Sequence, residues 1–136
     1  MKLKVGYQEL ISQAMAEIET IPLEKAQTLL DDPDTVFVDI RDVRELERDG
    51  MIPNALHAPR GMLEFWVDPE SPYFKPLFGE GKRLILYCAS AWRSALATET
   101  LQKMGLPRVS HLEGGLSAWK KAELPTVAKV SKPHSA

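Results

Sequence analysis

Two short runs of mostly apolar, β-branched residues constrain the fold of this chain more than any other feature. Residues 36–40 read Val-Phe-Val-Asp-Ile, and residues 83–87 read Arg-Leu-Ile-Leu-Tyr. Neither run alternates between apolar and polar residues, which is typical of parallel strands that are covered on both faces. Helical patterns lie between and after these runs. Strands that alternate with helices predict an α/β fold with a mostly parallel sheet.

The remaining elements follow from periodicity and from turn-forming residues. An amphipathic helix is predicted over residues 5–18, packed on the body of the domain or used for dimerisation. Its apolar face comprises Tyr7, Leu10, Ile11, Ala14, Met15 and Ile18. We expect further short helices after Pro22 and over 62–67, 94–104 and 116–121, a strand over 109–112, and a turn at Gly114-Gly115.

The length of the chain, 136 residues, suits one compact domain. A chain of this size buries roughly two-thirds of its unfolded surface, which is enough for one apolar core. We expect a helical extension over residues 1–17, the domain itself over 18–126, and a flexible tail over 127–136.

Composition excludes several classes of function. The 17 basic and 19 acidic residues give a net charge of -2, which disfavours strong binding to nucleic acid or to acidic membranes. No apolar run reaches the roughly 20 residues that span a bilayer, and the N-terminus lacks a signal-peptide pattern. Cys88 is the single cysteine, so the chain forms no internal disulfide, and a reducing compartment, most simply the cytoplasm, is expected.

Cys88 stands where the second apolar run ends, before a short loop and a helix. In open parallel sheets, ligands bind beyond the carboxyl ends of the strands. A helix N-terminus there offers unpaired N–H groups and partial positive charge, so a thiol at this place ionises more readily than a free one. The small residues Ala89, Ser90 and Ala91 let the backbone curl around the sulfur, and Arg93 adds a permanent charge. The alternative is that Cys88 is only a small buried hydrophobe.

Other candidate residues support the site rather than carry the reaction. Asp39, at the end of the first strand, is expected to be a buried carboxylate bonded to the backbone or to an arginine. Arg41, Arg44 and Arg60 are the candidates for that pair or for steering anions. His57, His111 and His134 do not stand at metal-ligand spacing with Cys88, so no metal site is expected, although His57 could line the mouth of the pocket.

Four segments of the chain, taken together, resemble the rhodanese-like sulfurtransferase domains over about residues 18–125. They are Val-Asp-Ile-Arg-Asp at 38–42 with Glu45, Gly-Met-Ile-Pro-Asn-Ala at 50–55, Cys-Ala-Ser-Ala-Trp-Arg-Ser at 88–94, and Leu-Glu-Gly-Gly-Leu-Ser-Ala-Trp at 112–119. The second departs from the usual pattern at Met51 and Asn54. Ala91 stands where many members have Gly, which tolerates a positive φ without strain.

The resemblance implies a specific chemistry on a central five-stranded, mostly parallel sheet flanked by helices. Cys88 would take a sulfane sulfur from a small anionic donor such as thiosulfate and hold it as a persulfide. It would then pass the sulfur to cyanide, to a thiol or to a sulfur-accepting protein. Backbone N–H groups of Ala89, Ser90, Ala91, Trp92, Arg93 and Ser94 would hold the persulfide, and Arg93 would bind the sulfonate part of the donor. No cofactor is implied.

Two alternatives remain open. Tyrosine-type phosphatases place one residue more between their cysteine and arginine than the four that separate Cys88 from Arg93, and a phosphatase or arsenate reductase also needs an acid. Asp42 and Asp68 are available for that role, but no pattern marks either. A protein-to-protein sulfur-relay or regulatory module would have the same loop and a different client. The sequence leaves the oligomeric state open.

Overall fold

The chain folds around one five-stranded parallel sheet, as a computed structural model that describes residues 1–129 shows. The strands, in chain order, are β1 (Glu19–Ile21), β2 (Thr35–Asp39), β3 (Leu56–His57), β4 (Arg83–Tyr87) and β5 (Val109–Leu112). Their order across the sheet is β1-β5-β4-β2-β3, and every pairing is parallel. The predicted α/β class is confirmed, and β4 takes the central place.

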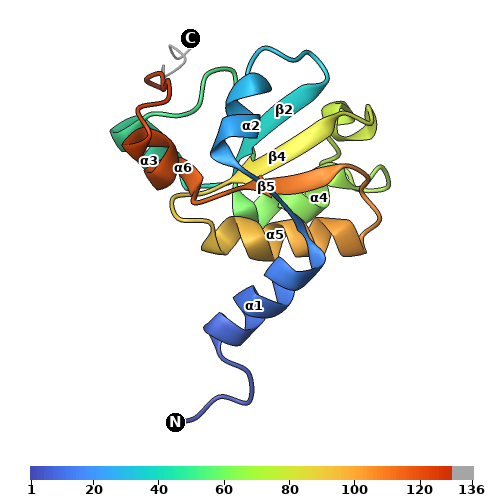
Figure 1. Cartoon of the computed structure of the whole chain (residues 1–136). Helices are drawn as coiled ribbons and strands as arrows, with labels where there is room; N and C mark the ends of the chain where they lie inside the picture. The colour runs from blue at the N-terminus through green and yellow to red at the C-terminus, as the bar shows by residue number, and fades with distance from the viewer. Residues whose placement is uncertain (130–136) are drawn as a thin grey trace.

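Helices cover both faces of the sheet (Figure 1). On one side lie α4 (Leu63–Val67) and α5 (Trp92–Lys103); on the other lie α2 (Leu23–Thr28), α3 (Val43–Asp49) and α6 (Gly115–Lys121). Short 3-10 turns occupy η1 (Arg60–Met62) and η2 (Pro76–Gly79). The core is therefore divided into two apolar layers, one on each face.

Alternate residues of each strand enter opposite layers, as the pleat requires. From β4, Leu84 and Leu86 enter the layer under α4 and α5, whereas Ile85 and Tyr87 enter the layer under α2 and α6. Cys88 continues this alternation and points into the α5 layer. The apolar character of both runs thus follows from burial on both sides.

The N-terminal helix α1 (Tyr7–Glu17) packs against α5 and carries the N-terminus away from the sheet (Figure 1). Its apolar face is only partly covered. Ala14 is fully buried, and the Gln102 side chain donates a hydrogen bond to the Glu17 carbonyl (2.8 Å). Leu10 and Met15 stay exposed. The helix is confirmed, and its predicted packing on the body holds for the face around Ala14.

Two further expectations concern the ends of elements. The helix predicted from 94 begins at Trp92, because Ala91 adopts a left-handed conformation that ends the loop there. Of the tail predicted over 127–136, Val127 exchanges two backbone hydrogen bonds with Met51 (2.9 and 2.8 Å), and 130–136 lie outside the described residues.

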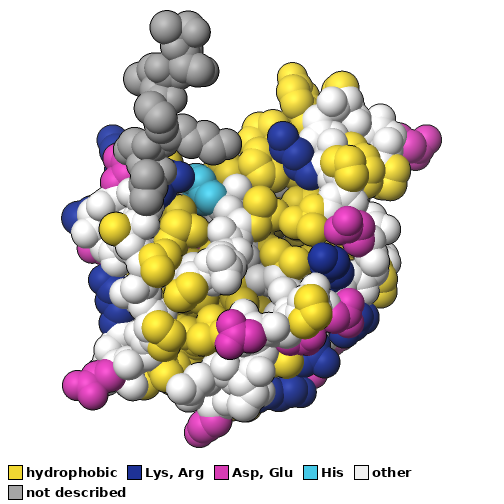
Figure 2. Space-filling view, turned by 90° about the horizontal axis from the view of Figure 1, so that it is seen from above, with side chains coloured by type: hydrophobic (Ala, Val, Ile, Leu, Met, Phe, Trp, Pro, Cys, Tyr) yellow, Lys and Arg dark blue, Asp and Glu magenta, His cyan; other side chains and the backbone are white. Residues whose placement is uncertain are grey.

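Acidic and basic side chains alternate around the rim of the face in Figure 2, with apolar side chains between them. This face therefore carries no large area of one charge, in keeping with the net charge of -2. Among residues 1–129, no helix is both long and apolar enough to cross a bilayer.

Candidate active site

Cys88 lies at the carboxyl end of the central strand, where the sheet order places β5 on one side of β4 and β2 on the other. Its side chain points toward the first turn of α5, and only 1% of the residue is exposed. The sequence placed the cysteine correctly at a strand end, but it gave no measure of this burial.

The loop ends in a strained residue, Ala91, directly before the start of α5. Ala91 has φ +81° and ψ -6°, a left-handed conformation that is unusual for alanine. Within residues 1–129, the backbone N–H groups of residues 89–94 donate to no protein acceptor. Six unpaired donors thus follow Cys88 directly, in the loop and the first turn of α5, and such a run of free N–H groups favours the binding of an anion.

The Gly114-Gly115 turn holds this loop from the other side. The N–H groups of Leu116 and Ser117 donate to the carbonyls of Cys88 and Ala89 (both 2.9 Å). A Cβ on Gly115 would lie 2.6 Å from the Cys88 carbonyl oxygen, so only glycine permits this approach. The turn was predicted, but its contact with the cysteine loop was not.

Arg93 is anchored by a carboxylate from a distant segment. Its guanidinium donates two hydrogen bonds to Glu45 (both 2.9 Å), and this pairing lowers the pKa of Glu45. Glu45 also completes the capping box of α3 with Asp42, so its position is fixed. The pairing with Glu45 raises the pKa of Arg93, with a smaller contribution from Cys88. Sequence reasoning listed Glu45 in a motif without this role.

Asp39 and Arg41 form a buried ion pair on the opposite side of the sheet from Cys88. Arg41 Nη2 lies 2.7 Å from Asp39 Oδ2 and also donates to the Gly50 carbonyl (2.7 Å). The Tyr87 hydroxyl accepts from the Ile52 N–H (3.1 Å), and burial raises the pKa of Tyr87. These bonds fasten the segment after β2 to the sheet end. Of the three candidate arginines, Arg41 is the partner of Asp39.

The other predicted residues have partners of their own. Arg60 pairs with Glu64 (2.8 Å), and Arg44 pairs with the capping carboxylate of Asp42 (3.1 Å). His57 Nε2 lies 2.7 Å from the Arg41 carbonyl oxygen, so this ring braces the backbone.

Trp92 is 54% exposed at the start of α5 and contacts Tyr7 of α1, with the ring centroids 5.1 Å apart. Trp119, by contrast, is fully buried, as expected for a core residue.

A buried chain of side chains leads away from the sulfur beneath the loop. The Cys88 thiol donates to Ser94 Oγ (3.7 Å), Ser94 Oγ lies 3.1 Å from His111 Nδ1, and His111 Nε2 lies 3.0 Å from Thr20 Oγ1. Ser94 and His111 are fully buried, and burial lowers the pKa of His111 to about 4. Sequence analysis missed this chain, because its members come from β1, α5 and β5.

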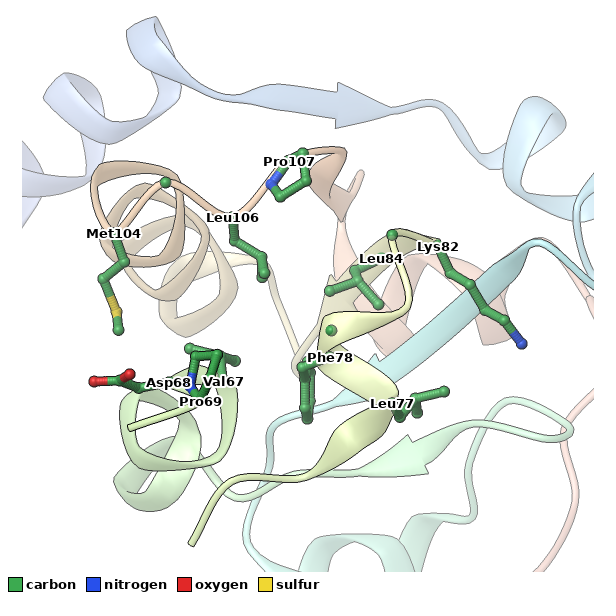
Figure 3. A pocket seen from close by; sticks show the side chains of 13 residues that line it. Val67, Asp68, Pro69, Leu77, Phe78, Lys82, Leu84, Met104, Leu106 and Pro107 are labelled. Atoms are coloured by element: carbon green, nitrogen blue, oxygen red, sulfur yellow. The ribbon is translucent and has the colours of Figure 1, made fainter. Parts of the chain in front are cut away.

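A cavity of about 470 Å³ lies at the other end of the sheet (Figure 3). Its wall includes Leu84 at the start of β4 and Met104 and Leu106 after α5, with Asp68 and Lys82 on opposite sides. Asp68, one candidate acid for a phosphatase, therefore lines a cavity at the opposite end of the sheet from Cys88. In the described part of the chain, no three His, Cys, Asp or Glu side chains gather as metal ligands.

Comparison with known proteins identifies relatives of this architecture. A family model described as a rhodanese-like domain matches residues 22–122. A sulfurtransferase of Allochromatium vinosum is 36% identical over 103 residues, which cover 76% of this chain and 88% of that protein. An uncharacterized protein of Synechocystis is 35% identical over 116 residues, 85% of this chain; the match spans only 60% of the Synechocystis protein.

A solved structure from Rhodopseudomonas palustris superimposes with a TM-score of 0.90 and 47% identity, covering 93% of this chain and 98% of that one. That protein is described as one of unknown function and a possible tyrosine phosphatase.

Proposed function

Because the chain belongs to the rhodanese-like family, whose relatives include sulfurtransferases, we propose that it transfers sulfane sulfur through a persulfide on Cys88. The observation that carries this proposal is the set of six unpaired backbone N–H groups, from residues 89–94, that directly follow Cys88 at the end of β4. Such a set stabilises a small sulfur anion without any cofactor.

The reaction has two steps. In the first, the Cys88 thiolate attacks the outer sulfur of thiosulfate; the S–S bond of the donor breaks, and sulfite leaves with the electron pair. In the second, an acceptor such as cyanide or a thiolate attacks the outer sulfur of the persulfide and regenerates the Cys88 thiolate. With cyanide, the product is thiocyanate. The loop amides hold the negative outer sulfur between the two steps.

Arg93 binds the sulfonate part of the donor in this scheme. Its guanidinium is partly exposed and already paired with Glu45, which fixes its orientation beside the loop. A guanidinium has five N–H donors, so the donor anion can use those that Glu45 leaves free. Asp39 and Arg41 support the site indirectly, by fixing the backbone next to the end of β4.

The test is intact mass spectrometry after incubation with thiosulfate. We expect a gain of one sulfur atom that dithiothreitol reverses and that cyanide converts to thiocyanate. The Cys88→Ser variant provides the control and should gain nothing. An unchanged mass of the native protein after treatment with thiosulfate, with inorganic polysulfide and with a protein persulfide donor would refute the proposal.

Two other functions are separated by the same assay. A sulfur adduct formed only from a protein donor would favour a relay module. Hydrolysis of an aryl phosphate without a sulfur adduct would favour the phosphatase suggested by the description of the Rhodopseudomonas relative. Against a phosphatase stand the four-residue spacing from Cys88 to Arg93 and the engagement of Asp42 as the cap of α3.

A further inference from the structure

The chain of hydrogen bonds beneath Cys88 is the feature that the proposed function leaves unused. It runs from Sγ through Ser94 Oγ and the His111 ring to Thr20 Oγ1, with links of 3.7, 3.1 and 3.0 Å. Thr20 belongs to β1, the strand at the edge of the sheet, and is half-buried. The chain therefore connects a buried sulfur to the sheet edge.

We propose that His111 is a positioning residue for the sulfur chemistry: by changing which ring nitrogen bears its proton, it turns the Ser94 hydroxyl from an acceptor for the Cys88 thiol into a donor for the ionised sulfur. The inference rests on the proposed function, because a sulfur that alternates between thiol, thiolate and persulfide needs both arrangements. A hydroxyl can act as acceptor or as donor.

The two arrangements balance in protons. With the thiol, S–H donates to Ser94, the Ser94 hydroxyl donates to Nδ1, and Nε2–H donates to Thr20. On ionisation, each proton moves one link along the chain, and the hydroxyl proton of Thr20 leaves to solvent. Nδ1–H then donates to Ser94, and the Ser94 hydroxyl donates to the sulfur anion. The imidazole is neutral in both arrangements.

The environment of His111 keeps the ring neutral, as this exchange requires. Burial alone lowers its pKa to about 4, with no contribution from a charged neighbour. From the elements packed against β5, the titratable or charged groups are Arg93 at the site, the exposed Glu19 on β1, Arg83 and Tyr87 on β4, and the partly exposed Glu99 with the exposed Lys103 on α5. Of these, Arg93 interacts with Cys88, and Tyr87 faces the opposite layer.

The Ser94 hydroxyl has a second possible acceptor besides the sulfur and His111, so the His111 ring is needed to set the direction of its proton. Its hydroxyl lies 3.2 Å from the Ala91 carbonyl oxygen, within the same loop. Without a partner at Nδ1, the hydroxyl proton turns to that carbonyl and away from the sulfur. With Nδ1–H donating to Ser94 Oγ, one lone pair is occupied and the hydroxyl proton is free to turn toward the sulfur.

Two substitutions of His111 separate the two ring nitrogens. The amide of His111→Asn reaches the position of Nδ1 and keeps a partner for Ser94, whereas the amide of His111→Gln reaches that of Nε2 and contacts Thr20 only. Thr98→Val is the control for packing, because Thr98 carries another fully buried hydroxyl on α5 that is not part of the hydrogen-bond chain from Cys88 to Thr20.

The readouts are kcat and KM for sulfur transfer from thiosulfate to cyanide and the pH midpoint of thiolate ultraviolet absorbance, corrected with Cys88→Ser. We expect H111Q to lower kcat about tenfold, the equivalent of one hydrogen bond, with KM unchanged. Its absorbance midpoint should rise by about one pH unit. H111N should recover most of both effects, and T98V should show neither.

A double-mutant cycle with Ser94→Ala completes the test. If His111 acts through Ser94, H111Q adds little to S94A; independent, additive losses would overturn the inference, as would equal losses in H111N and H111Q. If the His111 variants fail to fold, S94A still tests the hydrogen-bond chain, since this single substitution should by itself raise the pH midpoint of thiolate absorbance. Absence of any sulfur adduct in the native protein would refute the proposed function, while the order of the absorbance midpoints would still decide this inference.

Discussion

At the scale of single residues, the site depends on charges that are already paired. Arg93 is held by Glu45 through two hydrogen bonds, so its charge is partly compensated before any donor arrives. The same pairing fixes the guanidinium in one orientation. Orientation and net charge therefore have opposite effects on anion binding, and substitutions at the two residues separate them.

We expect Arg93→Ala to weaken the use of thiosulfate more than the use of a neutral persulfide donor. Glu45→Gln should lower KM for thiosulfate by up to about tenfold, because it removes a competing charge within the site. Gln at this position retains the capping box of α3. Steady-state kinetics with both donors provide the measurement. Equal losses for the two donors in R93A would contradict the assigned role.

Ala91 gives a prediction for stability. Its left-handed conformation, with φ +81°, costs about 1–2 kcal/mol in any residue with a Cβ. Ala91→Gly removes that cost, whereas Ala89→Gly, at a position of negative φ, removes none. The greater freedom of unfolded glycine is common to both variants. In urea unfolding, A91G should therefore be the more stable by about 1–2 kcal/mol, and equal stabilities would show that the loop is not strained.

His111 predicts how stability changes in acid. Because burial lowers its pKa from 6.5 to about 4, the unfolded chain takes up this proton first as the pH falls. The folded state is therefore favoured fully above pH 6.5 and loses up to about 3 kcal/mol between pH 6.5 and 4. Urea unfolding across this range should show a smaller loss in His111→Asn. Parallel curves for the two proteins would exclude the effect.

At the scale of elements, the loop is clamped between α5 and the N-terminus of α6. Gly115→Ala places a methyl group 2.6 Å from the Cys88 carbonyl oxygen and 2.7 Å from that of Ala89. We expect a loss of more than about 3 kcal/mol in the free energy of unfolding and a failure to form the persulfide.

Gly81→Ala is the matched control for this substitution. Gly81 has a similar positive φ, +75°, but nothing lies within 4 Å of its added Cβ. It should lose only about 1–2 kcal/mol, the cost of the conformation alone, and should keep its sulfur transfer. If both variants behave alike in thermal unfolding and in sulfur loading, the contact between α6 and the loop has no role of its own.

Some elements were predictable from the sequence, and others were not. The runs at 36–40 and 83–87 predicted β2 and β4, because burial on both faces leaves a continuous apolar signal. No such signal marks β1 and β3, which have three and two residues. The place of Cys88 between a strand end, a short loop and a helix was also predictable, since it depends on adjacent residues. The contact with His111 was not, since the parallel register of β1 with β5 brings Thr20 to His111, and the packing of α5 on β5 brings Ser94 there.

At the scale of the whole molecule, one buried ion pair connects the sheet to the segment that leads into β3. Arg41 is 1% exposed and Asp39 fully buried, and Arg41 also binds the Gly50 carbonyl. Removing one charge leaves the other buried without compensation. Which arginine pairs with Asp39 could not be predicted, because the bend of the backbone after β2 decides it.

Asp39→Asn should therefore lower the free energy of unfolding by about 3–5 kcal/mol. Asp42→Asn is the control, since Asp42 pairs with the exposed Arg44, and asparagine caps helices well; we expect a change below about 1 kcal/mol. Urea unfolding at neutral pH measures both. Similar losses for the two variants would mean that the buried Asp39–Arg41 pair contributes no more to stability than the exposed Asp42–Arg44 pair.

The two ends of the sheet carry different surfaces. The carboxyl end holds Cys88 and its free amides, whereas the 470 Å³ cavity opens at the end where β4 begins. The proposed site of sulfur transfer thus lies at one end of the sheet and the cavity at the other.

The hydrogen bonds from residues 116 and 117 to the Cys88 loop also fix the order in which the loop and its support form during biosynthesis. Cys88 is synthesised before residues 116 and 117, so its loop emerges from the ribosome before the residues that hold it. We therefore expect a chain that ends before α6 to contain Cys88 without the two hydrogen bonds that hold its loop in place.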